Sequence, residues 1–169
     1  MHPFVIFALT APLAAFAAPL QRRQQQNLDA TVLKFADVLN QFEAQFYSAA
    51  LSKFVDNDFA SAGFRSTQIP LEQYLLIQND ETTHSSVLQS GLAAIGDEPI
   101  TSCKFNLDAA TKDVATMTAT ARVVENLGVA AFLGAAPLIS DPIILQAAGS
   151  ILTVEARHQT IVNILSSSG

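Results

Sequence analysis

The 169-residue sequence has no tryptophan, a single cysteine and few charged residues. Cys103 has no second cysteine to pair with, so the fold cannot rest on intrachain disulfides. Nine Lys and Arg against 15 Asp and Glu give a net charge of −6, so the basic face that nucleic-acid binding needs is missing. With 14% charged and 50% hydrophobic residues, the chain is expected to bury much of its surface in one domain.

An apolar run at the N-terminus, from Phe4 to Ala18, ends in small residues as a secretory signal peptide does. The run is too short to span a bilayer. We therefore expect residues 1–18 to be a signal peptide, residues 19–26 a flexible or propeptide segment, and residues 27–169 the folded domain. Arg22 and Arg23 form either a dibasic processing site or two solvated charges. The expected location is extracellular, either secreted or in the cell wall.

A second apolar stretch covers residues 128–154. Pro137, Asp141 and Pro142 interrupt it, and Glu155 follows directly, so no uninterrupted run of about 20 apolar residues remains. We expect no stable membrane span after signal cleavage.

Proline divides the rest of the chain into stretches near 25 residues, and strand-type alternation is nowhere sustained. This predicts an all-α bundle of four helices. The first helix is expected to run from Asn27 or Asp29 to about Val55, and the second from the vicinity of Pro70 to about Ala94. The third is expected to run from Asp108 to about Gly134, and the fourth from Asp141 and Pro142 to about Ser166. The connection at about residues 95–107 has the length for either a hairpin or a crossover along the bundle.

Apolar residues three or four apart mark the face that each helix is expected to bury. The predicted stripes are Phe35, Leu39, Phe42, Phe46 and Ala50; Tyr74, Ile77, Leu88 and Leu92; Val114, Met117, Ala121, Val124 and Phe132; and Ala148, Ile151, Val162 and Leu165. Charged residues fill the gaps in these stripes. The six that are expected to point inward are Glu43, Glu81, His84, Glu125, Glu155 and His158.

Four ionised carboxylates in an apolar interior would cost several kcal/mol each and would repel one another. Arg122 and Arg157 do not balance them, and each has a ready alternative at the bundle surface. Two divalent cations do, with the two imidazoles as neutral ligands. The spacing Glu-x-x-His occurs twice and puts a carboxylate and an imidazole on one helical face, one turn apart. The sequence therefore predicts a metal site at mid-bundle.

These motifs resemble the ferritin-like superfamily of carboxylate-bridged di-metal proteins. They are Glu43 in QFEAQFY, Glu81 to His84 in ETTH, Glu125 in ARVVENLGVAAFLGAA, and Glu155 to His158 in ILTVEARH. The phrases around Glu125 and Glu155 also resemble the ferritin-like domain of secreted fungal stress-response proteins and plant desiccation-related proteins. The resemblance covers roughly residues 28–165. It implies a ferritin-like four-helix bundle with a long crossover between the second and third helices and a di-iron or di-manganese centre.

The resemblance implies less about the reaction, because members of the superfamily store iron, oxidise it, reduce peroxide or act on substrates. Two functions stay open. The first is a secreted metal-binding protein that consumes O2 or peroxide in a stress response. The alternative is a non-enzymatic extracellular structural module with a vestigial metal site. No catalytic residue is assigned beyond the six ligand positions.

Four further residues have roles that the sequence leaves open. Asp80 points either across to His158 or to solvent, and Tyr47 either faces the site as a hydrogen-bond donor or packs in the core. Gly128 and Gly149 lie inside helices, where glycine costs about 1 kcal/mol relative to alanine. We expect a close approach of neighbouring helices at both glycines.

Overall fold

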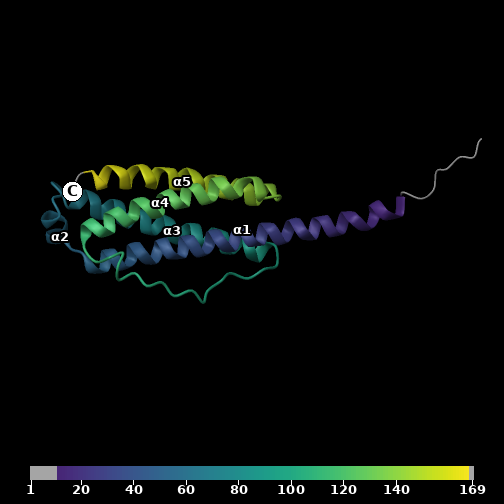
Figure 1. The fold of residues 1–169 in the computed structure, drawn as a ribbon, viewed down its shortest axis with the longest axis horizontal. Coiled ribbons are helices and arrows are strands. Elements are labelled where there is room, and N and C mark those ends of the chain that lie inside the picture. The colour runs from purple at the N-terminus through teal and green to yellow at the C-terminus, as the bar shows by residue number, and fades with distance from the viewer. Residues whose placement is uncertain (1–10, 168–169) are drawn as a thin grey trace, which may run out of the picture.

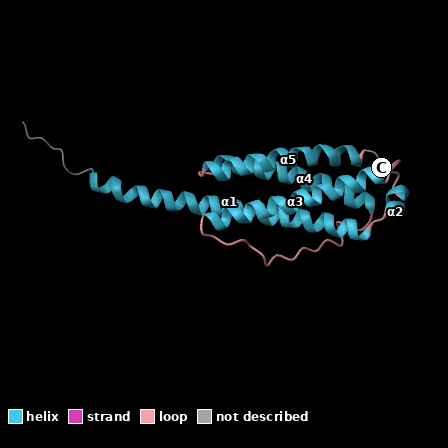
Figure 2. Cartoon of the chain, turned by 180° about the vertical axis from the view of Figure 1, so that it is seen from behind, coloured by secondary structure: helices cyan, strands magenta, loops and turns pink. Residues whose placement is uncertain are grey.

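The computed structural model describes residues 11–167, with side chains described for Gln24, Gln25 and residues 28–167. This part of the chain is helical. The helices are α1 (Ala11–Lys53), α2 (Asp56–Ser61), α3 (Gln68–Ala94), α4 (Val114–Ala135) and α5 (Pro142–Ser166), with the 3-10 helix η1 (Ala136–Leu138) after α4. The four long helices lie side by side as a bundle (Figure 1; Figure 2), which confirms the predicted fold class.

Two of the four predicted helix starts hold, those of α3 and α5, and two are wrong, those of α4 and α1. α5 begins at Pro142, and the Asp141 carboxylate accepts hydrogen bonds from the amides of Ile143 and Ile144, as an N-cap does. α3 includes Pro70 in its first turn, as predicted. α4 begins five residues later than expected, after Asp113 instead of Asp108. The Asp113 carboxylate caps the amide of Thr116, while residues 108–112 form turns.

Helix α1 begins at Ala11 and not at Asn27 or Asp29, so the predicted helix start is wrong. The preceding residues are mainly Ala, Leu and Gln, which favour helix, and this part of α1 extends past the other helices (Figure 1). Asp29 is no cap. Its buried carboxylate accepts hydrogen bonds from the amides of Ser140 and Asp141 and from the Ser140 hydroxyl, which ties α1 to the turn before α5. Residues 1–10 of the expected signal peptide lie outside the described residues, and the division at residues 18 and 26 stays a prediction.

The connection from α3 to α4 is a crossover and not a hairpin. It runs along α1 over nearly the whole bundle (Figure 1). Its contacts follow α1 in order: Asp97 binds Lys34 at 2.7 Å, the Ile100 carbonyl accepts from Gln41, and the Thr111 carbonyl accepts from Lys53. The crossover makes α3 and α4 run in the same direction, while α1 pairs with α3 and α4 pairs with α5.

The buried face of α1 differs from the predicted stripe. Phe35 is 56% exposed, and Leu39 and Phe42 are only half-buried. The ring of Phe42 packs edge-on against Phe105 of the crossover, with 5.3 Å between the ring centroids. Helix α1 thus has a second apolar side, which packs against the crossover and does not face the bundle core. The face that points into the bundle carries Leu33, Ala36, Asp37, Asn40, Glu43, Phe46, Tyr47 and Ala50.

The stripes predicted on α3, α4 and α5 are buried as expected. The core divides into two apolar clusters, one at each end of the bundle. One includes Phe46, Tyr74, Met117 and Val162, and the other includes Leu33, Leu88, Phe132 and Ile151. Along every long helix the polar residues of the predicted metal site lie between the two clusters, so apolar packing separates this site from both ends.

Among the described residues, one stretch is long and apolar enough to cross a membrane by length and composition, namely Val114–Leu138. A core helix of a soluble protein passes the same test. The stretch includes all of α4, which packs on α5 and carries the buried carboxylate of Glu125.

Candidate metal centre

Six polar side chains from four helices converge between the two apolar clusters. They are Glu43 of α1, Glu81 and His84 of α3, Glu125 of α4, and Glu155 and His158 of α5. All four glutamates are fully buried, and the two histidines are 6% exposed or less. The structure thus brings together every residue that the sequence placed at the site.

The two Glu-x-x-His motifs interlock across the interface of α3 and α5. Nδ1 of His84 lies 3.2 Å from Oε2 of Glu81 on its own helix and 3.3 Å from Oε1 of Glu155 on the other. Nδ1 of His158 lies 2.8 Å from Oε1 of Glu81. Each imidazole therefore turns Nδ1 toward carboxylates. One ligand atom from each of Glu81, Glu125, Glu155 and His158 can be chosen so that all four lie within 4.8 Å of one another.

Most of the inward-facing atoms of this cluster lack a hydrogen-bond partner. They are Oε1 of Glu43, Oε1 of Glu81, Oε2 of Glu125, both Oε atoms of Glu155 and Nδ1 of His158. The short separation of His158 Nδ1 and Glu81 Oε1 does not have hydrogen-bond geometry. Buried polar atoms in folded proteins are almost always satisfied, because an unpaired one costs about 1–3 kcal/mol. So many unpaired buried atoms at one place are compatible with a site that binds cations.

Gly128 of α4 provides the space that this cluster occupies. A Cβ atom at this position would overlap Oε2 of Glu155 and lie 3.3 Å from Oε1 of Glu43. The close approach predicted at Gly128 is therefore present, and its neighbours are site carboxylates. The same prediction for Gly149 is wrong, because a Cβ atom there meets nothing within 4 Å.

Asp80 reaches across to His158, which resolves the alternative left open by the sequence. Its Oδ2 atom lies 3.0 Å from Nε2 of His158 and 2.6 Å from a terminal nitrogen of Arg157. A carboxylate at Nε2 holds the proton there and leaves Nδ1 free to bind a cation. The equivalent position on α5 is Val154, which cannot hydrogen-bond to His84, so the two halves of the site are unequal.

Two residues of α1 contact site carboxylates. The Tyr47 hydroxyl donates a hydrogen bond to Oε1 of Glu125 at 2.5 Å, so Tyr47 faces the site as well as packing in the core. Asn40 lies one turn before Glu43 and donates to its Oε2 at 3.4 Å. The sequence pattern did not identify Asn40, because the stripe predicted for α1 placed the buried face on the side of Phe35. The sequence feature that could have identified Asn40 is its position three residues before Glu43, which places both side chains on one face of the helix.

The electrostatics of the cluster show a shortage of positive charge. Burial, followed by repulsion from Glu155 and the other site carboxylates, raises the pKa of Glu43 well above its usual value. Burial raises the pKa of Glu155 to about 7. Burial alone would lower the pKa of His84 and His158, but the close glutamate carboxylates outweigh it and raise these pKa values to about 9 and 10. Without cations the cluster therefore retains protons.

The donor set fits divalent transition metals. Four carboxylates and two imidazoles suit iron or manganese, whereas the cluster contains no thiolate to favour an iron–sulfur centre. Four glutamates carry −4 when ionised, which two divalent ions would neutralise. In the free protein the two imidazolium groups supply only part of that charge.

A four-helix bundle with a long crossover and a buried carboxylate–histidine cluster at its centre is the architecture of a metal-binding helical bundle. A comparison with protein families matches the ferritin-like domain over residues 28–168. The chain belongs to the ferritin-like domain family, whose members usually bind metal ions. A comparison with curated proteins gave no significant match.

Proposed function

We propose that Glu43, Glu81, His84, Glu125, Glu155 and His158 bind two divalent metal ions, iron or manganese. The observation that carries this proposal is the group of buried, unpaired carboxylate oxygens around Nδ1 of His158. Two ions would supply the positive charge that the cluster lacks and would give its unpaired oxygens partners. Membership of the ferritin-like domain family supports the same assignment.

The protein's own residues would prepare the site for redox chemistry. The apolar clusters on both sides limit access of water, Asp80 fixes the proton of His158, and Tyr47 donates to Glu125. Bound iron would supply the chemistry for reducing dioxygen or peroxide. We propose that such a reaction, in a secreted or cell-wall protein, contributes to a stress response, as the resemblance to fungal and plant proteins suggests.

The test of metal binding is reconstitution with ferrous iron under anaerobic conditions, followed by metal analysis. We expect about two ions per chain in the native sequence. The variant Glu81→Ala/Glu155→Ala should lose them. The matched control is Glu72→Ala/Glu98→Ala, which removes two exposed glutamates and should keep full loading. Equal loading of the two double variants, or no loading of the native protein, would refute the proposal.

The reaction has its own test. The reconstituted protein should consume dioxygen or peroxide faster than free iron at equal concentration, and the double variant lacking Glu81 and Glu155 should not. If the protein binds two ions yet shows no such consumption, and a ligand variant still supports the native role, the structural-module function is the correct one.

A further inference from the structure

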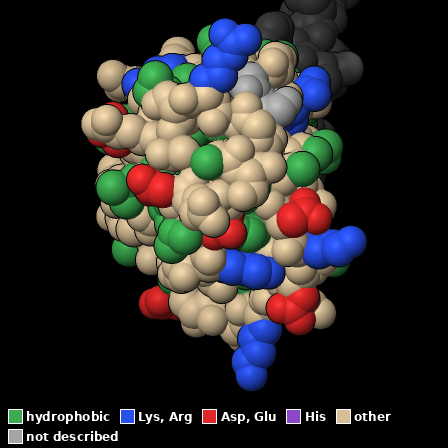
Figure 3. Space-filling view, turned by 90° about the vertical axis from the view of Figure 1, so that its left-hand side faces the viewer, with side chains coloured by type: hydrophobic (Ala, Val, Ile, Leu, Met, Phe, Trp, Pro, Cys, Tyr) green, Lys and Arg blue, Asp and Glu red, His purple; other side chains and the backbone are tan. Residues whose placement is uncertain are grey.

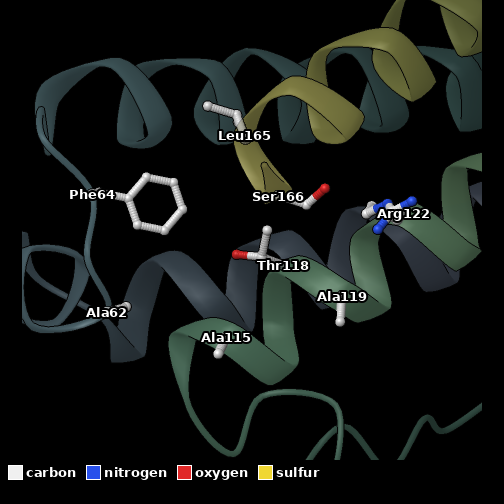
Figure 4. Close-up of a pocket in the computed structure, with 8 residues that line it drawn as sticks. All are labelled: Ala62, Phe64, Ala115, Thr118, Ala119, Arg122, Leu165 and Ser166. Atoms are coloured by element: carbon white, nitrogen blue, oxygen red, sulfur yellow. The ribbon is translucent and has the colours of Figure 1, made fainter. Parts of the chain in front are cut away.

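A cavity of about 150 Å³ opens at the end of the bundle that carries α2. It lies between α4, the end of α5 and the loop after α2 (Figure 4). Phe64 and Leu165 form apolar walls, Ala119 lies on the α4 side, and Thr118, Ser166 and Arg122 provide the polar groups. None of these residues belongs to the carboxylate–histidine cluster.

The size and walls of this cavity suit one aromatic ring. A protein cavity of about 150 Å³ lined by apolar side chains accommodates benzene. The Phe64 ring projects into the space from the loop, with Leu165 beside it on α5 (Figure 4). A planar ring can stack on or pack edge-on against Phe64, which adds to the free energy gained from burial.

Arg122 gives the cavity a preference for negative charge. Its Nε atom donates to Oδ1 of Asn163 at 3.0 Å, which fixes the guanidinium at the rim. Among the described residues, Arg122 forms no ion pair, so its terminal N–H groups can bind a carboxylate with two hydrogen bonds. The bundle end as a whole shows Lys and Arg mixed with Asp and Glu (Figure 3), so no general positive field attracts anions there.

The only two tyrosines of the chain, Tyr47 and Tyr74, connect the cavity to the carboxylate–histidine cluster. Thr118, which is buried, accepts a hydrogen bond from the Tyr74 hydroxyl at 3.3 Å. The Tyr74 ring stacks on Tyr47, with 5.8 Å between the centroids, and Tyr47 donates to Glu125. Thr118 also lies two helical turns before Glu125, about 10 Å along α4. Thr118 and Tyr74 therefore connect a ligand in the cavity to Tyr47, which is the hydrogen-bond donor to Glu125.

We propose that this cavity binds a small aromatic carboxylate, with its ring against Phe64 and Leu165 and its carboxylate on Arg122. Thr118 and Ser166 lie between Phe64 and Arg122 (Figure 4), and their hydroxyl oxygens can accept a hydrogen bond from a hydroxyl substituent. The proposal does not depend on metal binding, so its test uses the metal-free protein and either proposal can fail alone.

The test is titration of the full chain with benzoate, followed by calorimetry and by amide and tyrosine-ring NMR signals. We expect saturable binding, with shifts at Thr118, Ser166 and Tyr74. Benzyl alcohol, which lacks the charge, and acetate, which lacks the ring, should each bind at least about tenfold more weakly, because each loses one of the two interactions. Equal binding of acetate, or no saturation with benzoate, would overturn the proposal.

Two variants locate the site, and one controls for charge. Arg122→Gln should weaken benzoate binding by about tenfold or more. Ala119 is an exposed residue of α4 that lines the cavity, so Ala119→Leu should leave the fold intact. The larger side chain should fill the cavity and abolish binding. Arg65→Gln removes a neighbouring arginine that does not line this cavity and should leave the affinity unchanged. Benzoate affinity that is unchanged in Arg122→Gln or in folded Ala119→Leu would place the binding elsewhere and refute the assignment.

Discussion

Oδ2 of Asp80 lies 3.0 Å from Nε2 of His158, across the interface between α3 and α5. Asp80 directly precedes Glu81, so one turn of α3 supplies both a site carboxylate and the group that orients the opposite histidine. The Arg157 guanidinium holds the same oxygen at 2.6 Å. The carboxylate–histidine cluster is thus supported by an ion pair at the bundle surface. This support exists only at His158, because Val154 occupies the equivalent position on α5.

This arrangement makes Asp80 a positioning residue. Asp80→Ala should lower metal affinity by about 10–100-fold, because His158 loses the acceptor that holds its Nε2 proton and orients Nδ1 toward the cluster. The measurement is competition with a calibrated chelator. Asp97→Ala removes an aspartate that pairs with Lys34 on the crossover, away from the cluster, and should leave the affinity unchanged. If Asp80→Ala and Asp97→Ala lower metal affinity equally, Asp80 acts only through the net charge of the protein and does not position His158.

Gly128 and Gly149 form a matched pair of helix-interior glycines with opposite surroundings. Gly128→Ala should destabilise the fold by several kcal/mol or displace Glu155, and metal loading should fall, because the added Cβ overlaps a site carboxylate. Gly149→Ala meets open space and should raise the free energy of unfolding by roughly 0.5–1 kcal/mol. Denaturant unfolding and metal analysis measure both effects. A Gly128→Ala variant with native stability and full loading would contradict the packing described for α4.

The stability of the metal-free protein should fall as the pH rises from about 4.5 to about 10. Glu43 and Glu155 have raised pKa values, so the folded state holds protons that the unfolded state loses above pH 4.5. His84 and His158 do the same between pH 6.5 and about 9 to 10. When the native state binds more protons than the unfolded state, the free energy of unfolding decreases with pH. Glu81, whose pKa is lowered, acts in the opposite direction only below pH 4.5.

Thermal unfolding after removal of metal by a chelator checks this prediction at pH 5.5 and pH 8.5. The Tm should be lower at pH 8.5. The variant Glu43→Gln/Glu155→Gln lacks two of the titrating groups and should show a flatter dependence. The metal-loaded protein should behave in the opposite way, because cations bind the deprotonated ligands more tightly as the pH rises. A metal-free Tm that increases with pH would show that the cluster does not retain protons.

The sequence predicted α3 and α5 well because their apolar stripes are interrupted only by the Glu-x-x-His motifs. On α1 it was right for Phe46 and Ala50, which are buried, but wrong for Phe35 and Phe42, which the structure turns toward the surface and the crossover. Periodicity within one helix cannot distinguish a side covered by a crossover from a side covered by the bundle. The same error hid Asn40.

Tertiary contacts account for the other differences. Asp29 has the character of an N-cap, but its partner is the turn at Ser140, more than 100 residues away in sequence. The start of α4 was placed at Asp108, which is the same residue type as Asp113, but it is the Asp113 carboxylate that accepts a hydrogen bond from the amide three residues ahead. The hydrogen bond from Asp80 to His158 and the open space around Gly149 likewise depend on how helices are placed relative to each other.

The most direct measurement of the central claim is anomalous X-ray diffraction from crystals of the iron-loaded or manganese-loaded protein, collected on both sides of the metal absorption edge. Two anomalous peaks should appear within the cluster, bounded by the four glutamates and two histidines, and both should be absent in Glu81→Ala/Glu155→Ala. Peaks only at the bundle surface, or a metal-loaded crystal with no peak among these six residues, would contradict the account.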